Sequence, residues 1–365
     1  KTRLSSLMIS QDIINDEAVL IIDPKGDLDL VKGIYSAAKT AHRCEDLLIV
    51  HAGYPEHSAK YNPLKVFSSV SEVATRITSG MKAEGSSTAF KDFAWKYLNM
   101  TAMGLYIMGE SITFDRLSSY AHSPKQLLQV YCDQWLSLKV EHYGEEIEQI
   151  LFEASQKAVN RKHAVAEMTR VQAIQECISR WVELDSQLTA LADVNGDYLL
   201  ELYQASQLSD EYYQKITANI GPLLDKITTT QAGAIFSWDE ACGSSEVILE
   251  EAIKNKQIIY IGLNAMENSV MSESIGKALV SDLLSVFGRI YNAPPAQLTL
   301  CCHIDEFSEL VQDDMVTLLN KAGGAGVKIT AYTQTVNDLG QAFSTKDKAR
   351  QLMGNFGSLT LLRVA

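Results

Sequence analysis

The stretch that decides the fold of this protein is residues 298–306, which read Leu-Thr-Leu-Cys-Cys-His-Ile-Asp-Glu. Its apolar run lacks the regular polar alternation of a half-exposed strand, so it predicts a strand buried on both faces. Two carboxylates, Asp305 and Glu306, follow directly. At the carboxyl end of a parallel strand, the first can hold Mg²⁺ through water and the second can orient and deprotonate an attacking water, which is the Walker B pattern. Such a pair alone is more often a surface turn or a helix cap, so its weight comes from its position.

Short apolar runs bounded by turn residues recur towards both ends of the chain. They cover residues 18–23, 47–52, 258–263, 297–305, 327–334 and 358–365. Helical patterns lie between most of them, for instance at 274–291 and 309–321. This alternation is typical of β-α-β units with right-handed crossovers. We therefore predict an α/β fold with a mostly parallel, doubly wound sheet.

The middle of the chain has a different pattern. Stretches with a helical period predict helices at 124–139, 145–160, 163–191 and 210–228, without strands between them. We expect an inserted all-α domain at 112–229, between a first part of the nucleotide-binding domain at 1–111 and a second part at 230–365. The insert holds 17 acidic and 10 basic residues, a net charge of −7, against 28 and 22 in the remainder. The insert is thus the acidic part of the chain.

Composition excludes several classes of protein. A net charge of −13 argues against a protein that coats nucleic acid with its whole surface, because phosphate binding depends on Lys and Arg. The longest apolar runs fall short of the ~20 residues of a membrane helix, and no signal peptide is visible. The six cysteines show no CxxC spacing and are interpreted as reduced core thiols. These features predict a cytoplasmic segment whose DNA contacts are local.

Two further patterns suit a triphosphate site. Lys1 and Thr2 precede an amphipathic helix that leads into the strand at 18–23, as the last two residues of a Walker A motif do. There the Lys would reach the β- and γ-phosphates and the Thr hydroxyl would bind Mg²⁺. Gln334 follows the strand that begins at residue 327, where an amide can sense the γ-phosphate or the lytic water; a helix-capping role is the alternative.

Six motifs occur in one order along the chain. They are Ile21-Ile-Asp-Pro-Lys-Gly-Asp27, Asn62-Pro-Leu64, His303-Ile-Asp-Glu-Phe307, Ala322-Gly-Gly-Ala-Gly-Val327, Thr330-Ala-Tyr-Thr-Gln-Thr335 and Gly354-Asn-Phe356. Together they resemble TraD/TraG-type conjugative coupling proteins, and most closely the TraD branch of integrative conjugative elements. The resemblance spans nearly the whole chain, with the helical insert where the family carries its all-alpha domain.

The resemblance implies a RecA-like P-loop NTPase that uses ATP and Mg²⁺. Such a protein is a homohexamer anchored at the cytoplasmic face of the bacterial inner membrane. It receives relaxase-bound single-stranded DNA from the relaxosome and drives it toward a type IV secretion channel. By carry-over, Lys1 and Thr2 match the end of Walker A, Asp305 and Glu306 match Walker B, and Gln334 matches the sensor glutamine. Nucleotide would contact Lys1, Thr2 and Asp305, with Mg²⁺ held by Thr2 and, through water, by Asp305.

One departure from the family concerns an arginine that acts across the subunit interface. Many relatives carry it about eleven residues before the sensor glutamine, where this chain has Gly323. An arginine finger can contribute orders of magnitude in rate. Either another arginine, with Arg363, Arg350 and Arg76 as the candidates, supplies the charge or turnover is slow.

Other functions remain open at this point. A related motor of the chromosome-partitioning or virus-packaging type shares the fold. A non-hydrolysing scaffold, whose acidic insert docks a relaxosome protein, belongs to a different class, although a solvated helical surface explains the charge equally well. This segment starts at Lys1 without phosphate-cradling glycines, so by itself we expect it to be monomeric and to bind nucleotide weakly or not at all. The membrane helices would precede it.

Overall fold

The computed structural model describes residues 2–79, 81, 87–159, 168–183, 196–237, 245–292, 299–311, 313–335, 338–339 and 346–362. The chain divides into two compact units. Unit 1 comprises residues 1–87, 113–115 and 223–365, and unit 2 comprises residues 88–112 and 116–222.

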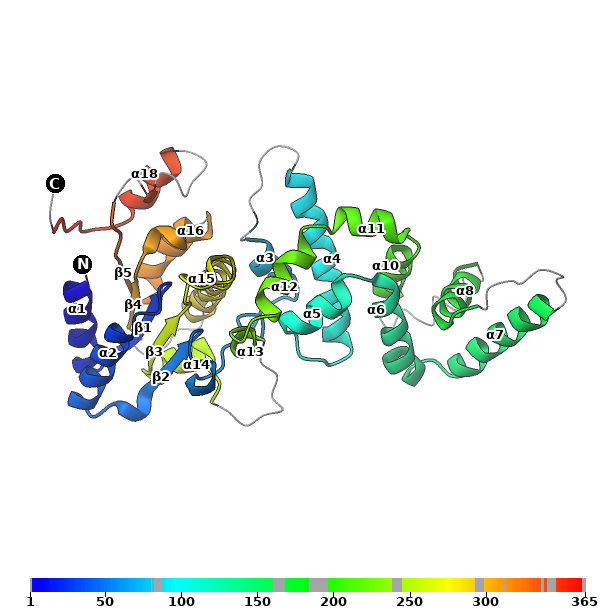
Figure 1. The fold of residues 1–365 in the computed structure, drawn as a ribbon, viewed down its shortest axis with the longest axis horizontal. Helices are drawn as coiled ribbons and strands as arrows, with labels where there is room; N and C mark the ends of the chain where they lie inside the picture. Colours follow the sequence, from blue (N-terminus) through cyan, green and yellow to red (C-terminus); the bar gives the residue numbers. More distant parts are fainter. Residues whose placement is uncertain are drawn as a thin grey trace. The chain divides into compact units, whose positions relative to one another are not determined.

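Unit 1 is built on a five-stranded sheet whose strands are all parallel (Figure 1). The strands are β1 (Ala18–Asp23), β2 (Leu47–His51), β3 (Ile258–Gly262), β4 (Leu300–Ile304) and β5 (Val327–Ala331), in the spatial order β2-β3-β1-β4-β5. Every residue of β1, β3 and β4 is buried, as expected of strands covered on both faces. The predicted parallel α/β sheet is confirmed.

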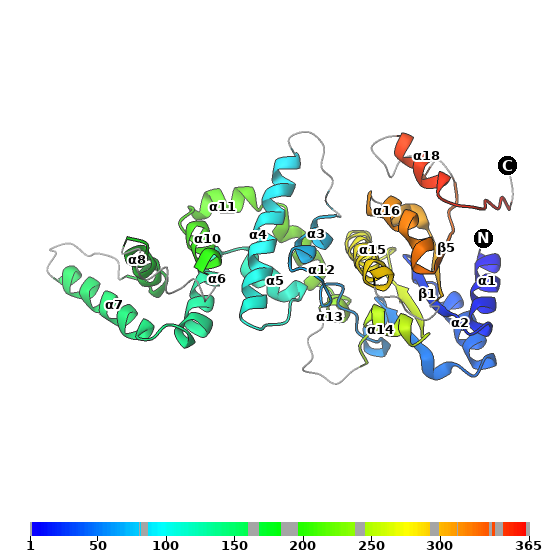
Figure 2. The ribbon, with the colours of Figure 1, turned by 180° about the vertical axis from the view of Figure 1, so that it is seen from behind.

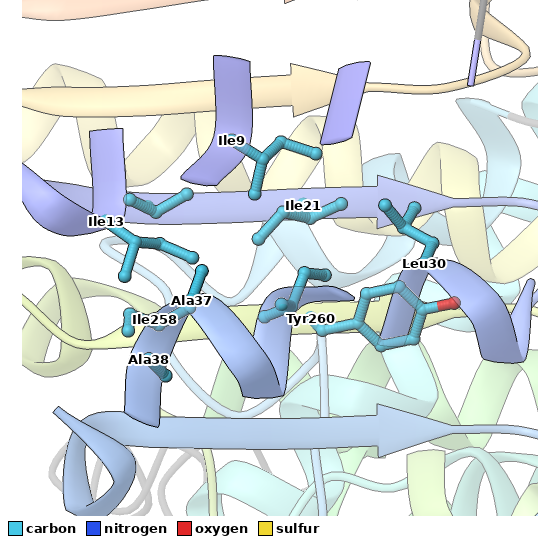
Figure 3. Close-up of a cluster of buried hydrophobic side chains, with 10 residues drawn as sticks. Ile9, Ile13, Ile21, Leu30, Ala37, Ala38, Ile258 and Tyr260 are labelled. Atoms are coloured by element: carbon cyan, nitrogen blue, oxygen red, sulfur yellow. The ribbon is translucent and has the colours of Figure 1, made fainter. Parts of the chain in front are cut away.

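Helices cover both faces of this sheet. Helices α1 (Thr2–Ile14) and α2 (Leu28–Thr40) lie on one face, and α15 (Ser269–Asn292) and α16 (Asp313–Ala322) lie on the other, as Figures 1 and 2 show from opposite sides. Figure 3 shows the core under α1 and α2, where Ile9 and Ile13 meet Ile21 of β1. Both layers bury apolar side chains of the same strands, which is why these strands read as continuous apolar runs.

Shorter elements complete unit 1. They are the helices α3 (Ser71–Ser79), α13 (Gly233–Phe236), α14 (Leu249–Lys254) and α18 (Lys346–Gly354), and the single turns Cys44–Asp46, Pro55–His57, Phe307–Glu309 and Gly323–Ala325. Residues 358–362 form no strand, which corrects the strand predicted at 358–365; residues 363–365 lie outside the described part. Leu359, Leu361 and Leu362 are exposed, so the apolar pattern of this stretch is not buried here.

Unit 2 is all-α in the part of the chain that the structure describes. Its helices are α4 (Ser87–Ile107), α5 (Phe114–Ala121), α6 (Pro124–Val130), α7 (Tyr143–Val159), α8 (Arg170–Glu183), α10 (Gly196–Ser206) and α11 (Asp210–Ile216). The first residues of α4 and α5 belong to unit 1, and α12 (Ile220–Thr228) is divided between the two units. The helix predicted at 124–139 continues past α6 as a π turn (Tyr131–Trp135) and a 3₁₀ turn (Leu136–Leu138). The helix predicted at 210–228 is two helices, because Gly221 and Pro222 favour a new start over continuation.

The boundaries of the units differ from the residues expected, 111/112 and 229/230. Helix α4, assigned by sequence to the nucleotide-binding domain, belongs to unit 2 from Thr88 onward. The physical reason is its partners: the ring of Tyr97 packs edge-on against Tyr213 at 4.9 Å, and the hydroxyl of Tyr198 donates to the carbonyl of Met100.

Five free cysteines lie in the described residues. Cys132, Cys177, Cys301 and Cys302 are buried thiols, as predicted. Cys44 is exposed, which corrects the prediction for that residue, because it begins a single 3₁₀ turn at the surface before β2. Cys242 lies outside the described part of the chain.

Candidate functional site at the carboxyl edge of the sheet

Glu306 occupies the first turn after β4 in a left-handed backbone conformation, with φ 39° and ψ 49°. Neighbouring strands hold this turn on both sides: the Asp305 N–H donates to the carbonyl of Ile22 in β1, and the Phe307 N–H donates to the carbonyl of Tyr332 after β5. The Glu306 N–H donates to Oδ1 of Asp305. A non-glycine residue in this region costs about 1–3 kcal/mol and persists only where its surroundings impose it, often at functional sites.

Two donors from different strand ends converge on the Glu306 carboxylate, whose side chain is 5% exposed. The Nζ of Lys25, after β1, forms an ion pair and hydrogen bond with Oε1. The Nε2 of Gln334, after β5, donates to Oε1 at 3.1 Å and lies 3.4 Å from Oε2. Because β1 and β5 are the two neighbours of β4, the cluster spans three adjacent strand ends. This edge is where open parallel sheets bind ligands.

The pKa values near the site follow from these contacts. The hydrogen bond to Glu306 raises the pKa of Lys25 above its ordinary value, so the Lys25 ammonium stays charged. Burial lowers the pKa of His303 in β4, against the opposing influence of Asp12. The two nitrogens of His303 contact Tyr332 Oη at 2.9 Å and Asp12 Oδ2 at 2.8 Å. This buried network ties α1 to the strand that carries Asp305 and Glu306.

The predicted site residues fall into three groups. Asp305, Glu306 and Gln334 lie together at adjoining strand ends. Thr2 is the exposed first residue of α1, and that helix points its amino end towards the same edge, since Asp12 contacts β4 and Met8 contacts Tyr332. Lys1 lies outside the described residues.

The three arginine candidates also differ in position. The side chain of Arg76 is fully buried and ion-pairs with Asp282 and Glu72 inside unit 1, so it is not placed to act on another subunit. Arg76 is therefore withdrawn as a candidate for the arginine that acts across the subunit interface, because its charge is paired with carboxylates inside unit 1. Arg350 is an exposed residue of α18, and Arg363 lies outside the described part.

Lys25 is the site residue that sequence reasoning missed. In the sequence it appears only as one residue of the Ile21–Asp27 motif, with no role of its own. The signal was nonetheless present, because a cation directly after one parallel strand and a carboxylate directly after another meet whenever the two strands are neighbours. That β1 and β4 are neighbours is a property of the tertiary structure alone.

Two general features of the described residues bear on function. No helix among them combines the length and apolar character needed to cross a bilayer. Over the same ranges, no group of three or more His, Cys, Asp and Glu side chains is arranged as a metal site.

Comparisons with known proteins found one family match and several similar solved structures. Residues 299–365 match the family model described as the TraM recognition site of TraD and TraG. No curated protein matches the sequence. Among solved structures, the bacterial conjugative coupling protein TrwBdeltaN70 in its unbound monoclinic form is 11% identical, with 95% of this chain and 68% of that chain covered at a TM-score of 0.49. The plasmid coupling protein TrwB with ADP and Mg²⁺ is 10% identical, with 95% and 70% covered at 0.49. VirB4 of Thermoanaerobacter pseudethanolicus is 12% identical, with 96% and 71% covered at 0.37.

The parallel sheet, covered on both faces and with carboxylates at the end of an interior strand, defines an α/β protein of the doubly wound, parallel-sheet class. The family match in residues 299–365 contains Asp305, Glu306 and Gln334. In this C-terminal part the chain is similar to TraD and TraG.

Proposed function

We propose that this chain is the ATP-hydrolysing motor portion of a coupling protein that links the relaxosome to a type IV secretion channel and drives transfer of single-stranded DNA. One observation carries the proposal: a buried carboxylate, Glu306, sits beside Asp305 and accepts a hydrogen bond from Gln334 at the carboxyl edge of a parallel sheet. Carboxylate, amide and ammonium groups gathered at such an edge suit a triphosphate with its metal ion.

Each residue has a distinct part in this proposal. The donor set fits Mg²⁺ and ATP, because hard oxygen ligands are what Mg²⁺ prefers and cations bind phosphate. Asp305 would hold the ion through water and Thr2 would bind it directly, while Lys1 would contact the phosphates. Bound Mg²⁺ would neutralise charge that develops on the phosphoryl oxygens. Glu306 would accept a proton from the attacking water, and Gln334 would orient that water.

The assembly and location belong to the same proposal. In the intact protein we place the chain in a homohexamer at the cytoplasmic face of the bacterial inner membrane, attached through segments outside residues 1–365. Relaxase, single-stranded DNA and channel components are the proposed partners. The family resemblance supports each of these points.

The proposal is tested by ATP hydrolysis in the intact protein that contains this chain. We expect Mg²⁺-dependent turnover that single-stranded DNA stimulates, because the site gathers the groups that activate water beside a phosphate. Phosphate release is measured with and without DNA and with EDTA as the metal-free control. An intact protein that neither binds nor hydrolyses ATP would rule the motor function out.

A second candidate function is docking of a relaxosome protein. The family model described as a TraM recognition site covers residues 299–365 and not the insert, so the charge of the insert carries this proposal. In this chain the insert offers a negative surface: Glu141, Glu145 and Glu148 around the start of α7 are 89%, 81% and 72% exposed.

If the insert docks a basic relaxosome protein, replacing these three glutamates by glutamine weakens binding about tenfold, since each contributes a few tenths to 1 kcal/mol. Added salt weakens wild-type binding in the same direction. Surface plasmon resonance at low and high salt measures both effects, with Glu56→Gln as an exposed control elsewhere. A binding affinity that changes with neither salt concentration nor the triple substitution would exclude the insert as the docking surface.

A further inference from the structure

Lys25 is placed at the candidate site by a rigid loop. The buried carboxylate of Asp23 accepts hydrogen bonds from the N–H groups of Lys25 at 3.0 Å and Asp27 at 2.7 Å. It also accepts one from the hydroxyl of Tyr260 at 2.8 Å. These contacts fix the backbone from which the lysine side chain starts.

The backbone at Gly26, the residue after Lys25, is also constrained. Gly26 has a φ of +71°, and a Cβ there would lie 3.0 Å from Cε1 of His51. The ring of His51 contacts the Gly26 carbonyl through Nε2 at 3.2 Å and accepts from the Gly53 N–H at 3.1 Å. Only glycine tolerates this backbone and this close approach without strain. The loop therefore presents the Lys25 side chain over the strand ends in one direction.

The ammonium of Lys25 faces both the protein and the solvent. Its side chain is 45% exposed, whereas that of Glu306, its partner, is 5% exposed. A compact cation half in solvent is suited to a second anionic partner on its open side. The site around it carries two carboxylates, Asp305 and Glu306, so an incoming phosphate needs a local positive charge to enter.

The ion pair also bears on the chemistry proposed for Glu306. The carboxylate oxygen Oε1 that receives the Lys25 ammonium is not open to an attacking water at the same time. Two donors, from Lys25 and Gln334, now occupy the carboxylate. For Glu306 to take a proton from water, the lysine must move off it. An anion that binds on the solvent side of Lys25 would draw the ammonium away.

We infer that Lys25 is a phosphate-binding residue of the nucleotide site: on arrival of the triphosphate its ammonium moves from Glu306 to a terminal phosphoryl oxygen. This inference rests on the proposed function. The Lys25 ammonium would supply a cation from within the same subunit. No bond is made or broken in this step; one ion pair replaces another.

The test is nucleotide binding by the intact protein with Lys25→Met, using fluorescent derivatives of a non-hydrolysable ATP analogue and of ADP. We expect the dissociation constant for the triphosphate analogue to rise about tenfold, the size of one charge-assisted hydrogen bond. ADP binding stays within about twofold, because the lost contact is to the terminal phosphate. Lys25→Arg keeps the charge and is expected to recover most of the affinity. Lys32→Met, whose side chain is 75% exposed and pairs with Asp29, is the matched control.

The outcomes separate the two proposals. A wild-type protein that binds neither nucleotide contradicts the motor function itself. A wild-type protein that binds both, with Lys25→Met and Lys25→Arg binding equally well, overturns the role of Lys25 alone. Equal losses for ATP analogue and ADP would also overturn it, since they indicate a general change of the site. If Lys25→Met instead weakens only single-stranded oligonucleotide binding, the anion is the DNA backbone and the inference is wrong.

Discussion

Replacement of Glu306 by Gln is expected to abolish DNA-stimulated ATP turnover in the intact protein while ATP binding persists. Glutamine keeps the size of the side chain but cannot accept the proton of the attacking water. Loss of a positioned general base typically lowers the rate by about 10²–10⁴-fold. Phosphate release under saturating ATP measures turnover, and the fluorescent ATP analogue measures binding.

The matched control for this substitution is Glu309→Gln. Glu309 ends the 3₁₀ turn that follows Glu306, and its side chain is exposed. We expect its turnover to stay within about twofold of the wild type, in line with the small effects of most surface substitutions. Wild-type turnover by Glu306→Gln would refute the role assigned to Glu306. Loss of binding together with turnover would indicate that the substitution disrupts the turn.

The second large effect concerns stability, and its centre is Arg76 in helix α3. The guanidinium lies 3.1 Å from Asp282 Oδ1 and 3.0 Å from Glu72 Oε2, and it donates to the carbonyl of Pro63 at 2.6 Å. Tyr61 donates its hydroxyl to the other oxygen of Asp282 at 2.8 Å. Removing one member of a buried pair leaves the other charge without compensation, which typically costs about 3–5 kcal/mol.

We therefore expect Arg76→Met to lower the free energy of unfolding by about 3–5 kcal/mol at neutral pH. The cost should be smaller at acidic pH. Burial raises the pKa of Asp282 to about 6 even with the arginine present, and removal of the cation raises it further. A carboxyl group whose pKa is higher in the folded state binds its proton more tightly there, so it opposes folding increasingly as pH rises above 3.8. Below that range Asp282 is neutral in both states.

Urea unfolding at pH 5 and pH 8, followed by circular dichroism, measures this dependence. Arg180→Met is the control, because Arg180 is 42% exposed and pairs with Glu153 and Glu176 at the surface. Its loss is expected to cost less than about 1 kcal/mol at either pH. Equal costs for the two arginines, or a cost for Arg76→Met that grows as pH falls, would contradict the buried pair described here.

Most strands could be predicted from short apolar runs in the sequence. The strands at 18–23, 47–52 and 258–263 are present within one residue of their expected bounds, because continuous apolar β-branched runs have few alternatives in a parallel sheet. Helix ends were less predictable. The stretch at 210–228 keeps one apolar period throughout, yet the structure has two helices there, and Gly221 and Pro222 lie in the first turn of the second one.

Long-range packing decided what these patterns left open. The assignment of α4 to the helical unit depends on Tyr198 and Tyr213, about a hundred residues further along the chain. The burial of Arg76 could not be predicted either, since a single arginine on a helix is usually exposed. Its ion pairs with Asp282 and Glu72 are seen only in the folded structure. A side chain's burial depends on neighbours that local periodicity does not specify.

Apart from the stretch at 358–365, the amino-acid sequence by itself determined the strands, the carboxylates that end one of them and the polar residue that ends the next, because strand formation and termination are properties of short segments. The tertiary structure decided the strand order, and with it the meeting of Lys25 and Glu306, 281 positions apart. Burial of apolar surface drives strands together without direction, so the pairing that results depends on how all the layers pack at once.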